Sequence, residues 1–141
     1  MYPVIFENAV VSIQHHPLHN LLLLRWPIHL TGDDYSFLLS KMIQLSAEHN
    51  IEGWFVDATD MEELDPADLQ WTLEQMPKLL MSTNVTKIAR LVSQSLMYEA
   101  KLNLLFSNAI ADQNLPIRVR FFTDEDDAME WLISVNKNNR P

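Results

Sequence analysis

Apolar residues follow two different spacings along the chain, one typical of β-strands and one typical of helices. Short apolar or alternating segments bounded by turn residues predict strands. These strands are expected over residues 4–6 with 9–14, then 20–26, 51–56, 86–92 and 117–122. Residues 15–19, between the first two strands, include Pro17 and are expected to form a hairpin loop.

Between these strands, apolar residues recur at intervals of three and four, which predicts amphipathic helices. Thr31 is expected to cap the first helix, and Pro66 to occupy the first position of the second. Pro77 is expected to kink or end that second helix, because proline lacks the backbone donor. The third helix is expected over residues 94–112, and the fourth begins after Asp124.

Strands that alternate with helices of this length form largely parallel sheets, because each helix returns the chain to the same end of the sheet. The sequence therefore predicts an α/β fold with a mostly parallel sheet of four to five strands, an N-terminal antiparallel hairpin strand and about four helices. No linker, composition shift or repeat divides the chain. Residues 1–141 are expected to form a single domain, with a disordered tail over residues 136–141.

Charge and composition narrow the possible partners. The chain has 19 acidic and 10 basic residues and a net charge of −9, which argues against binding to nucleic acid or to an anionic membrane surface. It has no cysteine, so disulfides and thiol chemistry are excluded. No signal peptide is recognisable, and the longest apolar run, residues 21–24, is too short to span a bilayer. We expect a cytoplasmic protein without membrane insertion.

The motifs of common enzymes are missing. Gly32 and Gly53 are the only glycines, so a glycine-rich phosphate loop cannot be formed, and no G-x-S-x-G turn is present. Ser93 and Ser95 follow a predicted strand, but capping of the next helix accounts for them. We therefore expect no catalytic residues and no cofactor, and predict that the protein is not an enzyme.

Two clusters resemble metal sites in composition but not in spacing. An acidic stretch between Asp57 and Asp68 offers the oxygen ligands that hard cations need, but it lacks the spacing of a calcium loop. Carboxylates next to a helix start are explained by the helix dipole. His15, His16 and His19 share the expected loop without the H-E-x-x-H arrangement. We therefore expect no metal site in either cluster.

The order of elements points to a known family. The chain has a leading hairpin, three further βα units and a strand that ends in Val56-Asp57, within the stretch IEGWFVDATDMEELDPADLQW, and it closes with the helix FFTDEDDAMEWL. In these features residues 10–133 resemble the SpoIIAA-like group, the fold shared by STAS domains and by the lipid-binding CRAL-TRIO (SEC14-like) domains.

The resemblance has two functional implications. STAS domains of the anti-sigma-factor antagonist type carry a phosphorylatable serine or threonine in a D-S-S-G-L-like turn at the start of the helix after this strand. The matching turn, residues 64–69, has Asp65 but neither a hydroxyl nor a glycine. The resemblance therefore implies a regulatory or protein-interaction module without the serine phospho-switch. The CRAL-TRIO side implies, as the alternative, a small protein that binds an apolar ligand or lipid.

We expect the interaction module to bind a protein partner, or a second copy of the chain in a homodimer, through the acidic loop and the helix after it. Trp71 lies off the apolar face of that helix and is expected to be exposed for contact. The candidate binding residues are Asp57, Thr59, Asp60, Asp65, Asp68 and Trp71. A third hypothesis is an acid/base enzyme with Asp57 or Asp60 as the base, which would require an enclosed polar cavity.

Overall fold

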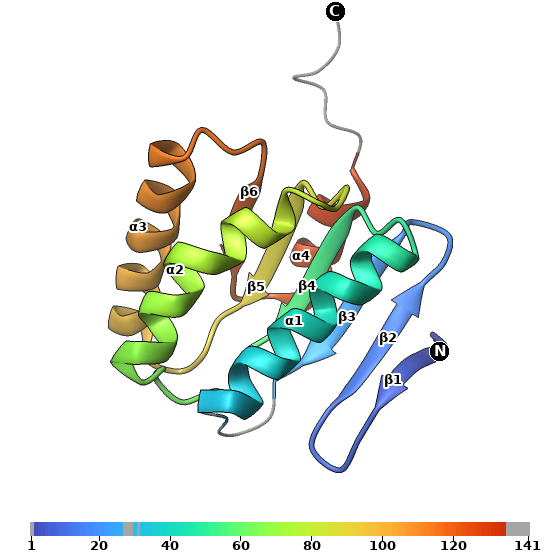
Figure 1. The fold of residues 1–141 in the computed structure, drawn as a ribbon, viewed down its shortest axis with the longest axis horizontal. Helices are drawn as coiled ribbons and strands as arrows, with labels where there is room; N and C mark the ends of the chain where they lie inside the picture. The colour runs from blue at the N-terminus through green and yellow to red at the C-terminus, as the bar shows by residue number, and fades with distance from the viewer. Residues whose placement is uncertain (1, 27–29, 31, 135–141) are drawn as a thin grey trace, which may run out of the picture.

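The computed structural model describes residues 2–26, 30 and 32–134 (Figure 1). The strands are β1 (Val4–Glu7), β2 (Ser12–His16), β3 (Leu21–Arg25), β4 (Gly53–Asp57), β5 (Lys87–Leu91) and β6 (Arg118–Phe122). The helices are α1 (Gly32–Glu48), α2 (Pro66–Leu80), α3 (Leu96–Asp112) and α4 (Glu125–Ile133). Thr31, Val135 and the predicted tail over residues 136–141 lie outside the described residues.

The strands of the described chain form one sheet in the order β1-β2-β3-β4-β5-β6. β1 and β2 pair in antiparallel fashion, as do β2 and β3, whereas the strands from β3 to β6 are parallel to one another. Because each of the three crossovers moves one strand further in the same direction, their helices α1, α2 and α3 lie on one face of the sheet (Figure 1). The last helix, α4, follows β6 and lies on the other face. The predicted α/β fold with an N-terminal antiparallel hairpin and a parallel sheet is confirmed.

The sheet has six strands where the sequence suggested four to five, because the N-terminal segment folds into two strands rather than one. The turn between β1 and β2 is fixed by Asn8, whose side-chain oxygen accepts hydrogen bonds from the backbone N–H groups of Val10 and Val11 (2.9 and 2.8 Å). Asparagine commonly stabilises turns in this way, because its side chain can accept hydrogen bonds from the backbone N–H groups that follow it.

The predicted hairpin loop is shorter than expected. His15 and His16 belong to β2, where they pair with Leu22 and Leu21. The connection narrows to residues 17–20, and Asn20 closes it with φ +55°, a left-handed conformation that asparagine tolerates. The loop assignment of the two histidines was therefore wrong.

β3 and β4 are buried on both faces. Leu22 and Trp54 point toward α1 and α2, whereas Leu21 and Phe55 point toward α4. Gly53 allows the close approach on the α4 side, because a methyl group there would lie 2.8 Å from a terminal carbon of Leu21. Since both faces are apolar, the sheet needs a helical layer on each side.

The helices begin where the sequence predicted, within one or two residues. Pro66 occupies the first turn of α2 as expected. Pro77 does not end α2, which continues to Leu80. In the described part of the chain, no helix is both long and apolar enough to cross a membrane.

Four histidines form two contacting pairs around β2. The rings of His15 and His49 lie 5.2 Å apart between centroids, and those of His16 and His19 lie 5.1 Å apart. Nε2 of His15 and Nδ1 of His16 are buried without a hydrogen-bond partner. Burial lowers the pKa of both residues from the usual 6.5, and the neighbouring histidines lower it further.

These lowered pKa values predict acid-sensitive folding. Between the unfolded pKa of about 6.5 and the lower folded pKa, the unfolded chain binds more protons than the native one, so stability is lost as the pH falls. We expect the free energy of unfolding, measured in urea, to decrease from about pH 7 toward pH 5.5. A His15→Gln/His16→Gln variant should show a flatter profile over this range. An equally steep profile in that variant would contradict the assignment.

Candidate functional site

The carboxyl edge of the parallel strands carries most of the acidic residues. Each strand from β3 to β6 is followed by a helix, so all four helices begin at this edge, where their dipoles favour negative charge. The acids in these connections and first turns are Asp33, Asp34, Asp57, Asp60, Glu62, Glu63, Asp65, Asp68, Glu99, Asp124, Glu125, Asp126 and Asp127. The topology therefore turns acids scattered along the sequence into one acidic edge.

The Asp57 side chain lies on the α4 face of the sheet and contacts one other candidate residue, Thr59. Asp57 is the last residue of β4, and side-chain alternation turns it toward the α4 face, where it lines a pocket with Glu125 and Asp126. Its carboxylate is 5% exposed by residue, forms an ion pair with Arg25 (3.4 Å), and accepts hydrogen bonds from the backbone N–H (3.0 Å) and hydroxyl of Thr59. Asp57 thus holds the start of the loop in place.

Asp68 and Trp71 are not on the exposed surface that the sequence predicted. The Asp68 carboxylate is buried and accepts the backbone N–H of Gly32 at 3.2 Å, so it caps the start of α1 from α2. Trp71 is half-buried and lies edge-on to the ring of Tyr35, 6.4 Å between centroids. Both residues pack α2 against α1, which sequence periodicity could not show because it does not reveal where the neighbouring helix lies.

The structure brings Thr59, Asp60 and Asp65 together. They border an open groove of about 940 Å³ between the β4–α2 loop and the β5–α3 loop. The three residues are exposed, and Asp65 is the N-cap residue of α2 without a side-chain capping bond. The groove is lined by Thr59, Asp60, Met61, Glu62, Glu63 and Asp65 from one loop and by Ser93, Gln94 and Ser95 from the other.

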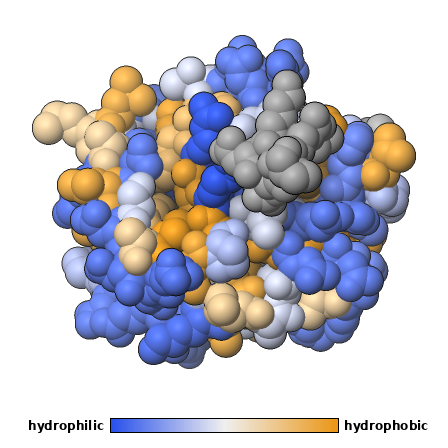
Figure 2. Space-filling model, turned by 90° about the horizontal axis from the view of Figure 1, so that it is seen from above, coloured by the Kyte–Doolittle hydropathy of each residue, from blue (hydrophilic) through white to orange (hydrophobic). Residues whose placement is uncertain are grey.

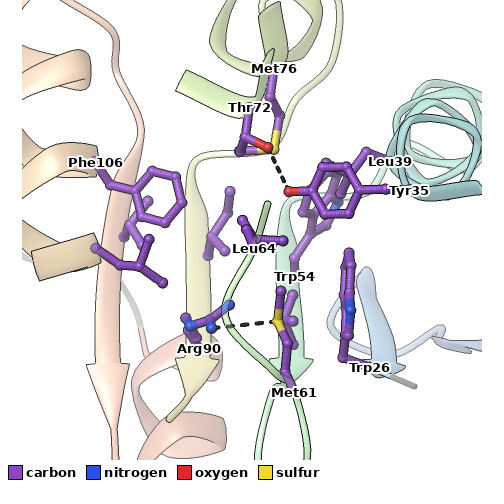
Figure 3. Close-up of a pocket in the computed structure, with 14 residues that line it drawn as sticks. Trp26, Tyr35, Leu39, Trp54, Met61, Leu64, Thr72, Met76, Arg90 and Phe106 are labelled. Atoms are coloured by element: carbon purple, nitrogen blue, oxygen red, sulfur yellow. Dashed lines mark hydrogen bonds between the residues drawn. The ribbon is translucent and has the colours of Figure 1, made fainter. Parts of the chain in front are cut away.

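A buried ion pair supports the groove, and sequence analysis missed it. Arg90 of β5 donates from Nε and Nη2 to the two carboxylate oxygens of Glu99 in α3, at 2.7 and 2.9 Å. Ser93 donates its hydroxyl to the same carboxylate (3.0 Å), so it does not act as the helix cap that we expected. Arg90 also contacts the sulfur of Met61 at 3.5 Å (Figure 3). The sequence does contain one sign of this ion pair, an arginine inside the apolar strand segment TKIARLV, because a buried arginine needs an acidic partner.

The loop between β4 and α2 is also attached to α3. The phenol oxygen of Tyr98 accepts the backbone N–H of Leu64 at 2.9 Å. Burial raises the pKa of Tyr98, so its hydroxyl stays protonated at neutral pH. Together with the Arg90–Glu99 pair, this bond fixes both walls of the groove to the same helix.

An apolar cavity of about 70 Å³ lies below the loop, between the sheet and the helices α1, α2 and α3. Trp26, Tyr35, Leu64, Met76 and Phe106 are among the side chains around it (Figure 3). At one side the hydroxyls of Tyr35 and Thr72 are 2.5 Å apart, and burial raises the pKa of Tyr35. The two hydroxyls are therefore uncharged, and they bring no charge to the wall of the cavity.

Among the described residues, no three histidine, aspartate or glutamate side chains are grouped as ligands for a metal ion. The fold buries three carboxylates at this edge. Asp68 caps α1, whereas Asp57 and Glu99 are each held by an arginine and a hydroxyl. Their role in the structure is to fix the two loops.

The buried ion pair predicts a strong double-mutant signal. Glu99→Leu alone leaves the Arg90 guanidinium buried and unpaired, and we expect it to destabilise the protein by about 3–5 kcal/mol. Arg90→Met/Glu99→Leu removes both charges and should recover most of that loss. Urea denaturation of Arg90→Met, Glu99→Leu and the double variant measures the coupling free energy between the two side chains. Additive losses would show that the two side chains do not stabilise the loops as a unit.

Comparison with known proteins identifies the fold. No family model matches the chain, and no curated protein matches its sequence. Among solved structures, the chain is similar to an uncharacterised protein of the DUF3478 family from Shewanella loihica, which is described as having a SpoIIAA-like fold. The two share 18% sequence identity over 91% of this chain and 98% of that chain, with a TM-score of 0.55. The predicted SpoIIAA-like fold is therefore confirmed.

Proposed function

We propose that this protein is a non-enzymatic regulatory module of the SpoIIAA-like/STAS type that binds a basic surface of a partner protein in the groove between its β4–α2 and β5–α3 loops. The observation that carries the proposal is the juxtaposition of exposed acids with an open groove at the carboxyl edge, where parallel sheets bind their ligands. A serine phospho-switch is not part of the proposal, because Pro66 and Ala67 occupy the turn after Asp65.

Charge selects the class of partner. Asp60, Glu63 and Asp65 are exposed at the groove, and the whole chain carries a net charge of −9. A basic partner would be attracted from a distance and oriented toward this edge. A second copy of the chain would bring acids against acids at the groove, so a homodimer through this surface is disfavoured.

The geometry supports binding better than acid/base catalysis. A catalytic carboxylate needs a free oxygen within reach of the proton that it transfers. Asp57 and Glu99 already accept hydrogen bonds from their hydroxyl and arginine partners, and Asp60 is exposed to solvent. The groove therefore presents a charged contact surface, whereas the buried carboxylates next to it keep the loops rigid.

Neutralising the rim of the groove tests this proposal. We expect Asp60→Asn/Glu63→Gln/Asp65→Asn to lose partner proteins that the wild type retains, because the electrostatic attraction is removed while asparagine still suits the N-cap position. The measurement is affinity capture from a lysate of the native host, quantified by mass spectrometry at low and high salt.

The matched control neutralises three exposed acids elsewhere, as Glu7→Gln/Glu48→Gln/Asp112→Asn. It should retain the same basic partners as the wild type, and high salt should weaken their binding. If the groove variant and the control capture the same proteins in the same amounts, the groove is not the binding surface.

The apolar cavity favours a second candidate function, the binding of a small apolar ligand. Its volume of about 70 Å³ is below the roughly 300–1,000 Å³ of typical ligand pockets, so a lipid chain fits only if flexible side chains such as Met61 and Met76 move. This size is the reason for placing ligand binding second.

Thermal unfolding of delipidated protein with and without dodecanoate tests this second candidate. A carrier should gain about 2.7 kcal/mol of stability at a ligand concentration one hundred times the Kd. Leu64→Phe fills part of the cavity, so it should remove that gain while leaving the protein folded. No change in the melting temperature of the wild type would exclude dodecanoate as a model for its ligand.

A further inference from the structure

β6 forms an open edge of the sheet. It is the last strand in the order, and it pairs with β5 alone. The N–H of Arg118 donates to Thr86 and the carbonyl of Phe122 accepts from Val92, so the backbone groups of residues 118, 120 and 122 face β5. Those of Val119 and Phe121 therefore face outward, and no other part of the described chain pairs with them.

The opposite edge of the sheet is less suitable for adding a strand. The register of β1 against β2 shifts between Val4 and Phe6, which marks a bulge or irregularity. Irregular edges resist pairing with another strand, whereas regular ones accept it. β6 pairs with β5 in unbroken register over all five of its residues.

One face of this open edge is basic, although the protein as a whole is acidic. The guanidinium carbons of Arg118 and Arg120 lie 5.8 and 5.5 Å from the centroid of the Trp131 ring, and the Lys87 ammonium lies 5.4 Å from it. Arg118 and Arg120 are exposed, and within the described residues neither forms an ion pair. Their contacts with the indole hold both guanidinium groups beside the open edge.

Lys87 and Arg118 also line a hollow at the amino edge of the parallel strands, at the far end of the sheet from the acidic groove. Figure 2 views the molecule from this end and shows apolar residues surrounded by hydrophilic ones. The basic edge and the acidic groove are therefore separate surfaces of the molecule.

We propose that the outer edge of β6 binds an extended acidic segment of a partner protein as an additional strand, with acidic side chains at alternate positions pairing with Arg118 and Arg120. Backbone hydrogen bonds to Val119 and Phe121 would provide affinity, and the two arginines would select the sequence. This inference does not depend on the proposed function of the groove.

The charges favour an acidic partner over a second copy of this chain. If two β6 strands paired in antiparallel fashion about Arg120, the two Arg120 side chains would lie directly opposite each other, and like charges at that position are destabilising. Arginines at an edge strand thus prevent self-pairing and leave the edge available to a strand of opposite charge.

A short blocked peptide that alternates threonine and glutamate is the probe. We expect it to bind the wild-type protein, measured by fluorescence anisotropy, and to slow amide hydrogen exchange at Val119 and Phe121. A peptide of the same composition with its glutamates adjacent, and one that alternates threonine and lysine, should bind at least about tenfold more weakly.

Two variants separate the backbone contribution from the charge contribution. Val119→Pro removes an outward donor and blocks strand addition, but leaves the bonds to β5 in place, so it should fold and lose binding. Arg118→Gln/Arg120→Gln should weaken binding about tenfold or more, whereas Lys78→Gln/Lys101→Gln, which removes two exposed charges elsewhere, should not.

Each result has a clear meaning once thermal unfolding shows that the variants are folded. Binding that survives Val119→Pro unchanged would overturn strand addition, and so would failure of the alternating peptide to bind the wild type. Equal affinity for the glutamate and lysine peptides would overturn the role of the arginines. Because the groove variant keeps β6 intact, it should bind the peptide like the wild type, whatever the fate of the proposed function.

Discussion

The two central strands, β3 and β4, are apolar on both faces, and the rest of the fold follows from the need to cover them. Leu21, Leu23 and Phe55 require a layer on one side, which α4 provides. Leu22 and Trp54 require a layer on the other, which α1 and α2 provide. A sheet that exposed either face to water would lose the burial that stabilises it, so the connection from β6 must cross to the face opposite the first three helices.

This arrangement also creates the charge distribution of the molecule. Parallel strands followed by helices place every helix start at one edge, and the acids that favour helix starts gather there. Three of these acids have structural roles: Asp57 fixes the β4–α2 loop, Asp68 caps α1, and Glu99 pairs with Arg90. Asp60, Glu62, Glu63 and Asp65 line the groove, and the remaining acids lie at the starts of α1 and α4. The same topology leaves β6 at an edge of the sheet, where Arg118 and Arg120 stack on Trp131. The order of elements therefore produces both the acidic edge and the basic one.

The buried Arg90–Glu99 pair links the groove to the core. It joins β5 to the first turn of α3 and, through Ser93, holds the loop between them. A pair that is buried and bonded in two places is costly to break, whereas its replacement by apolar residues is often tolerated. The pair therefore acts mainly by holding the β5–α3 loop, one wall of the groove, in a fixed position relative to the sheet.

The sequence alone determined the element order, the α/β class and the absence of glycine-rich and nucleophile motifs, because apolar periodicity and residue supply are local properties of the chain. It also placed Thr59, Asp60 and Asp65 near one another, since they are close in sequence. Only the tertiary structure decided that Asp68 and Trp71 are covered by α1, that His15 and His16 lie in a strand, and that Arg90 meets Glu99. Those outcomes depend on which elements become neighbours, and the packing that selects those neighbours is set by the whole chain rather than by any one segment.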